Sequence, residues 1–110
     1  MSPRRVVLVF DERASRRVLG PAERAIRSRW HLVLLSLGPR VSPRQQALVG
    51  QILGWAADSQ IEFDAIHVLN VGQLARYVEP EDSVLTFASF PRRRRIRRAL
   101  LTAETQRLVD

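Results

Sequence analysis

The chain has 110 residues, 45% of them hydrophobic and 26% charged, and its formal net charge is +7. This length corresponds to about one domain of roughly 100–200 residues, so we expect a single α/β domain over residues 1–110. The absence of cysteine excludes disulfides, thiolate nucleophiles and cysteine-based zinc sites. No apolar run approaches the roughly 20 residues of a membrane span. The basic N-terminus resembles a signal peptide, but Asp11-Glu12-Arg13 ends the apolar run too early, and we expect a cytoplasmic protein.

The positive charge is concentrated in one segment. Six arginines lie within residues 92–98, while the other 12 basic and 11 acidic residues nearly balance. All 18 basic residues are arginine, which either reflects the coding bias of a GC-rich gene or serves anion binding.

The first half of the chain predicts two strands and two helices. Val6–Phe10 and Leu32–Leu37 are short apolar runs typical of strands buried on both faces. Between them, a helical face is formed by Val18, Leu19, Ala22, Ala25 and Ile26. Gly20-Pro21 interrupts this face, so the helix either kinks there or restarts with Pro21 at its first position.

The second helix begins at Ser42, with Pro43 at its first position and Gln45 where a capping box requires it. Gly50 and Gly54 favour close packing of this helix on a sheet over membrane dimerisation. Its expected buried stripe comprises Leu48, Val49, Ile52, Leu53 and Ala56.

The remaining elements continue the alternation of strands and helices. Phe63–Leu69 and Val84–Phe90 are the third and fourth strands, and a short helix capped by Asn70 runs through Val78 between them. A final helix follows from Arg92, with Ile96, Leu100 and Ala103 on its apolar face. The order β-α-β-α-β-α-β-α predicts an open parallel four-stranded sheet with helices on both faces.

Ligands of such sheets bind beyond the carboxyl ends of the strands. Asp11-Glu12 is the carboxylate pair expected at that edge, for acid–base or metal chemistry, although capping of the first helix is the preferred interpretation. His31 and His67 have no metal-spaced partner and are interpreted as structural. Because no nucleophile, base and orienting group assemble in the sequence, we expect no enzyme, no catalytic or metal site and no cofactor.

Val7–Asp11, followed by the helix that opens at Ala14–Leu19, resembles the start of a universal stress protein domain. The resemblance implies an α/β fold with strand order 3-2-1-4, in which the strand-end aspartate, here Asp11, helps to hold ATP. The family's loop G-x-x-G-x9-G-[ST] aligns with Ala88 to Thr102, but only Thr102 matches it. Asp11 and Thr102 are therefore the candidate ligand-binding residues.

Alanine, proline and leucine replace the three glycines of that loop at Ala88, Pro91 and Leu101. A phosphate-cradling loop needs the positive φ and the close backbone approach that glycine permits. Pro91 also lacks an N–H group. We therefore expect ATP binding in the manner of the family to be lost.

The arginine run opposes the dipole of the last helix, because cations in a first helical turn cost roughly 0.3–1 kcal/mol each. We interpret it as a patch for an anionic surface, comprising Arg92, Arg93, Arg94, Arg95, Arg97 and Arg98. An anionic membrane, an acidic partner, a phosphorylated ligand and a solvated face remain alternatives. Nucleic acid is less favoured because no aromatic platform interleaves the arginines.

These observations predict a non-catalytic regulatory or assembly module of universal-stress-protein type, with a membrane transporter or another protein as candidate partner. The family adds a fifth strand that this chain, ending at Asp110, does not supply, so we expect a homodimer through the edge at Val84–Phe90. The alternatives are a nucleotide-binding stress protein that uses Arg92–Arg98 for phosphate contacts and a nucleic-acid-associated basic protein.

Overall fold

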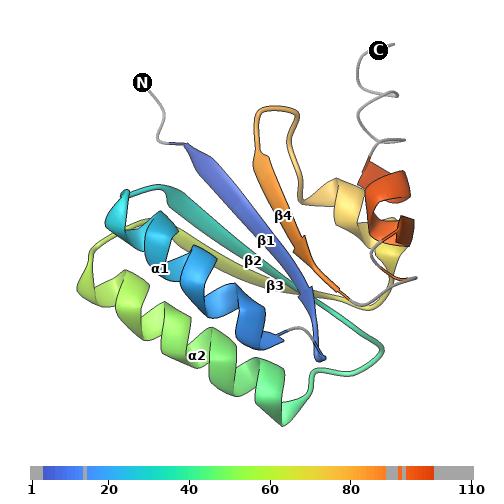
Figure 1. The fold of residues 1–110 in the computed structure, drawn as a ribbon, viewed down its shortest axis with the longest axis horizontal. Coiled ribbons are helices and arrows are strands. Elements are labelled where there is room, and N and C mark those ends of the chain that lie inside the picture. The colour runs from blue at the N-terminus through green and yellow to red at the C-terminus, as the bar shows by residue number, and fades with distance from the viewer. Residues whose placement is uncertain (1–3, 14, 89–91, 93, 101–110) are drawn as a thin grey trace.

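The computed structural model describes residues 4–13, 15–88, 92 and 94–100 (Figure 1). In chain order the elements are β1 (Arg5–Asp11), η1 (Ser15–Val18), α1 (Leu19–Arg27), β2 (His31–Leu37), α2 (Pro43–Asp58), β3 (Phe63–Val68), η2 (Val71–Arg76) and β4 (Ser83–Phe87). Residues 92 and 94–100 are also helical, and we call them the C-terminal helical segment. No helix among the described residues is long and apolar enough to cross a membrane.

The four strands form one sheet in the order β3-β2-β1-β4, and every pairing is parallel. The predicted fold class and strand order are therefore confirmed. β1 lies between β2 and β4, with Leu8 opposite both Leu34 and Leu85. Since all strands run the same way, the loops that leave their carboxyl ends gather at one edge of the sheet.

Both faces of the sheet are covered, which explains the continuous apolar runs of β1 and β2. Val6, Leu8 and Phe10 belong to the core under α1 and α2. Val7 and Val9 belong to a second core, on the side where η2 and the C-terminal helical segment lie (Figure 1).

α1 begins at Leu19 and continues through Gly20-Pro21. A helix start at Pro21, one of the two predicted alternatives, is therefore two residues too late. Pro21 is the third helical residue, where a backbone N–H has no intrahelical acceptor, so proline costs no hydrogen bond. The short 3₁₀ turn η1 connects β1 to this helix.

α2 has the predicted capping box: the Ser42 hydroxyl accepts from the Gln45 backbone, and the Gln45 side chain accepts from the Ser42 N–H. Two expectations for this helix are wrong. Leu53 is 47% exposed, because its position on the helix lies outside the face formed by the buried residues of α2. Gly50 and Gly54 are exposed with open space beside them, so they do not mediate packing on the sheet.

The helix between β3 and β4 ends at Arg76, whereas the prediction extended it through Val78. η2 is a 3₁₀ helix, and the Asn70 side chain makes no cap hydrogen bond. β4 ends at Phe87, which pairs with Phe10 of β1, whereas the prediction extended this strand to Phe90. Residues 89 and 90 lie outside the described part of the chain.

Removal of the α2 cap tests this account of the fold. Ser42→Ala should lower the unfolding free energy by about 1 kcal/mol, since the Gln45 N–H loses its acceptor at a buried helix start. Denaturant titration followed by circular dichroism measures the change. Ser28→Ala is the matched control, because Ser28 is exposed at the C-cap of α1. Equal effects of the two substitutions would contradict a stabilising cap at Ser42.

Candidate functional site

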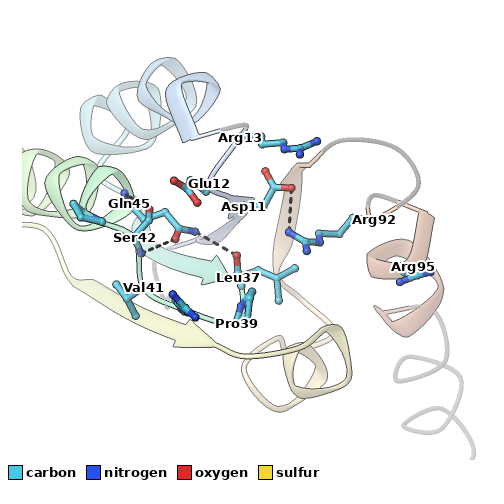
Figure 2. Close-up of a pocket in the computed structure, with 13 residues that line it drawn as sticks. Asp11, Glu12, Arg13, Leu37, Pro39, Val41, Ser42, Gln45, Arg92 and Arg95 are labelled. Atoms are coloured by element: carbon cyan, nitrogen blue, oxygen red, sulfur yellow. Dashed lines mark hydrogen bonds and ion pairs between the residues drawn. The ribbon is translucent and has the colours of Figure 1, made fainter.

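A cavity of about 640 Å³ opens at the carboxyl edge of the sheet (Figure 2). Its walls come from the loop after β1, from the loop between β2 and α2, and from the start of the C-terminal helical segment. This is the edge at which open α/β sheets bind their ligands.

Asp11, the predicted strand-end aspartate, lies in this cavity. It is the last residue of β1, its side chain is 2% exposed, and its Oδ2 is 3.5 Å from Nη1 of Arg92 (Figure 2). Burial of a carboxylate is costly unless a partner compensates its charge. The positive charge of Arg92 compensates the charge of the buried Asp11 carboxylate. Glu12 also lines the cavity and is exposed. Thr102, the other candidate ligand residue, lies outside the described residues.

Four arginines line the same cavity: Arg13 after β1, Arg40 after β2, and Arg92 and Arg95 in the C-terminal helical segment. The spacing of Arg92 and Arg95 places both on one side of a helix. Arg92 and Arg95 belong to the predicted arginine patch, whereas Arg40 was expected only as a strand-end residue and Arg13 was not predicted as a site residue. The signal for Arg13 and Arg40 was positional: each lies within three residues of the end of a strand.

The structure divides the predicted arginine patch. Arg94, Arg97 and Arg98 are exposed and are not among the residues that line the cavity. Ile96, in the same helical segment, is fully buried in the second core. Arg93 lies outside the described residues.

Ser36, His67 and Gly38 form a hydrogen-bonded group that the sequence did not reveal. Nε2 of His67 lies 2.9 Å from the Gly38 carbonyl oxygen, and Nδ1 lies 2.6 Å from Oγ of Ser36. A carbonyl only accepts, so Nε2 donates to it, and in the neutral ring Nδ1 accepts the hydroxyl proton of Ser36. The parallel register of β2 with β3 places Ser36 opposite His67, which sequence spacing alone does not specify.

This group contains a hydroxyl, an imidazole and an orienting carbonyl, a constellation that was not predicted from the sequence. Ser36 is only 5% exposed and does not line the cavity. The network instead anchors the loop after β2. The Gly38 N–H donates to the Val68 carbonyl at 3.1 Å, and the Gln45 side chain donates to the Leu37 carbonyl at 3.3 Å. One wall of the cavity is thereby fixed at three points.

His31, at the opposite edge of the sheet, is paired with carboxylates. Its Nε2 is 2.8 Å from Asp64 and its Nδ1 is 3.3 Å from Glu62. Arg5 lies nearby with Glu79 at 3.0 Å and Asp82 at 3.5 Å. Among the described residues, no group of three or more histidine, aspartate or glutamate side chains is arranged to hold a metal ion.

No protein-family model, curated protein or solved structure matches the chain. What the fold itself shows is a small α/β domain with a four-stranded parallel sheet.

The Ser36–His67 contact gives a measurable prediction. Ser36→Ala should lower the unfolding free energy by about 1–3 kcal/mol, because Nδ1 of His67 loses its hydroxyl partner in a part-buried position. The double variant Ser36→Ala/His67→Leu should lose less than the sum of the two single variants, since both partners are removed together. Denaturant titration measures all three. Strict additivity would show that the two side chains do not stabilise each other.

Proposed function

We propose that this chain is a non-catalytic binding module that takes an anionic, phosphate-bearing ligand in the cavity at the carboxyl edge and acts as a regulatory or assembly domain. The observation that carries the proposal is the convergence of Arg13, Arg40, Arg92 and Arg95 on one cavity. The cavity lining contains four arginines and only two carboxylates, Asp11 and Glu12, so a ligand there would meet a net positive charge.

The chemistry of arginine favours phosphate as the group bound. Its guanidinium presents several N–H donors in a planar fork that matches the oxygens of a phosphate, and its charge persists at any physiological pH. The cavity volume of about 640 Å³ is within the range of roughly 300–1,000 Å³ for small-molecule sites. Because the loop after β2 is held by hydrogen bonds, Arg40 starts from an anchored backbone and needs little reordering to bind.

A relationship to universal stress proteins is the finer form of this proposal. The strand order β3-β2-β1-β4 and the position of Asp11 at the end of β1 support it. The family's glycine loop does not, because Ala88 replaces its first glycine and is 6% exposed in the second core. Pro91 and Leu101 lie outside the described residues. We therefore assign the phosphate contacts to arginine side chains instead of a glycine-rich backbone, and a membrane transporter remains a candidate partner of such a module.

Two features support a binding role over a catalytic one. Ser36 is 5% exposed and does not line the cavity, so its hydroxyl is not presented to a ligand bound there. His31 is engaged by two carboxylates at the far edge of the sheet.

Neutralisation of the cavity arginines tests the proposal. Pyrophosphate should bind the full chain, and Arg40→Gln or Arg95→Gln should each weaken binding by about ten-fold or more, since a hydrogen bond to a charged group contributes about 1.5–3 kcal/mol. Isothermal titration calorimetry measures the affinities. Arg44→Gln is the matched control, because Arg44 is exposed on the same edge but does not line the cavity.

A ligand series sharpens the same experiment. ATP with magnesium should bind no more tightly than tripolyphosphate, because the cavity arginines recognise phosphate while the glycine loop that holds ATP in the family is absent from the sequence. A micromolar dissociation constant for ATP, well below that of tripolyphosphate, would contradict the loss of family-type ATP binding. Equal losses for Arg44→Gln and Arg40→Gln would show that net charge, and not the cavity, controls binding.

We also propose self-association through the edge strand β4, which pairs only with β1 among the described strands. Leu85 on this strand is 46% exposed, so an apolar side chain lies beside an unpaired backbone edge. Two such edges can pair about a two-fold axis and satisfy each other's backbone groups.

Leu85→Lys should therefore convert a dimer into a monomer, because it places a charge where two copies would meet. Sedimentation velocity at micromolar concentration measures the change. Leu53→Lys is the control, since Leu53 is 47% exposed on α2, away from β4. A parent chain that remains monomeric at high micromolar concentration would rule out this interface.

A further inference from the structure

The charge of the described residues is unevenly distributed along the direction of the strands. Residues 11–18, 38–44 and the C-terminal helical segment all begin at or follow the carboxyl end of a strand, and together they hold ten described arginines and two acidic residues. The rest of the described residues hold six arginines and seven acidic residues. The segments that leave the carboxyl ends of the strands therefore carry nearly all of the excess positive charge, and we call these three segments, with Leu69 and Asn70, the basic edge.

Exposed apolar side chains lie on the same edge. Val41, in the loop after β2, is 44% exposed, and Leu69, directly after β3, is 58% exposed. The hydrogen bond from the Gly38 N–H to the Val68 carbonyl places the starts of these two loops side by side. The basic edge thus presents two aliphatic side chains on neighbouring loops among its arginines.

The arginines outside the cavity extend this surface. Arg94, Arg97 and Arg98 are exposed on the C-terminal helical segment, and Arg44 is exposed at the start of α2. The cavity therefore does not account for their position at this edge.

We propose that the basic edge docks on an anionic lipid bilayer, with Val41 and Leu69 entering the interfacial region and the surrounding arginines contacting lipid phosphates. Each basic residue near the surface of an anionic leaflet strengthens the attraction to it. We expect each such residue to raise the partition coefficient between water and membrane by roughly five-fold. Apolar side chains that enter the interface add to that attraction, and the combination of two signals gives more stable binding than either alone.

The apolar residues favour a bilayer over nucleic acid as the occupant. Aliphatic side chains at loop ends gain burial in a lipid interface, whereas a sugar–phosphate backbone offers them no comparable environment. Among the described residues of the basic edge there is no aromatic side chain on which single-stranded bases could stack. This docking surface overlaps the cavity, because Val41 is also part of the cavity lining. Leu69, Arg94 and Arg97 do not line the cavity, so substitutions at these residues test docking separately from ligand binding there.

The test uses the full chain and co-sedimentation with vesicles of phosphatidylcholine, alone or mixed with phosphatidylserine, at low and high salt. The parent should bind only the mixed vesicles, and binding should weaken steeply as salt rises, because exposed charges are screened over about 8–10 Å at physiological ionic strength. Arg94→Gln/Arg97→Gln should reduce partitioning by on the order of ten-fold or more. Leu69→Ser should also reduce it at constant net charge.

Matched controls separate this surface from the rest of the molecule. Arg24→Gln/Arg76→Gln removes two exposed arginines that lie outside the basic edge, and Leu53→Ser removes an exposed leucine on α2. Both should bind vesicles as the parent does, and all variants should keep the parent's melting temperature. Arg94→Gln/Arg97→Gln and Leu69→Ser should bind pyrophosphate in solution as tightly as the parent does. The pyrophosphate titration therefore tests the cavity proposal, and the vesicle experiment tests the docking proposal.

Three results would overturn the inference. The first is no binding to mixed vesicles at low salt, and the second is an equal loss of binding in the basic-edge and control variants. The third is tighter binding to duplex DNA or RNA than to mixed vesicles, with unchanged vesicle binding in Leu69→Ser. That result would assign the edge to nucleic acid.

Discussion

Burial of β1 on both of its faces is the constraint on which the rest of this structure depends. Val7, Leu8, Val9 and Phe10 are all fully buried, so helices must cover the sheet on each side of this strand. With β2 and β4 paired to β1 in parallel register, the chain leaves all three strands at the same edge. Arg13, Arg40 and Arg92 meet at one cavity for this reason, although they are far apart in the sequence.

The sequence predicts the fold well wherever hydrophobic pattern and local capping decide the structure. The apolar runs identify the strands, and Ser42 with Gln45 identifies the start of α2. The pattern fails where a tertiary partner decides. β4 ends at Phe87 and not at the predicted Phe90, Leu53 is apolar but exposed, and the helix predicted between β3 and β4 is the 3₁₀ helix η2. For the candidate site, Asp11 could be named from its place after a buried strand. The pair Ser36 and His67 could not, because only the β2–β3 register brings them together.

The arginines of this chain have two separable features, their type and their position. A coding bias can explain why every basic residue is arginine, but it does not select one edge of a folded sheet for most of them. The periodicity of the C-terminal helical segment then places its arginines in different environments. Arg92 and Arg95 face the cavity, whereas Arg94 and Arg97 face solvent, with the buried Ile96 between them in the sequence.

The pairing of β1 with β4, the first and last of the described strands, also affects how this protein folds. β1 and β4 are neighbours, with Val6 opposite Ser83 and Phe10 opposite Phe87, so their ladder closes a loop that contains most of the chain. The entropy cost of such closure slows folding, since only late, long-range contacts repay it. During synthesis, β1 to β3 leave the ribosome before β4 does, and one edge of the buried strand β1 then stays unpaired. The nascent chain is therefore most exposed to aggregation in the interval before β4 emerges.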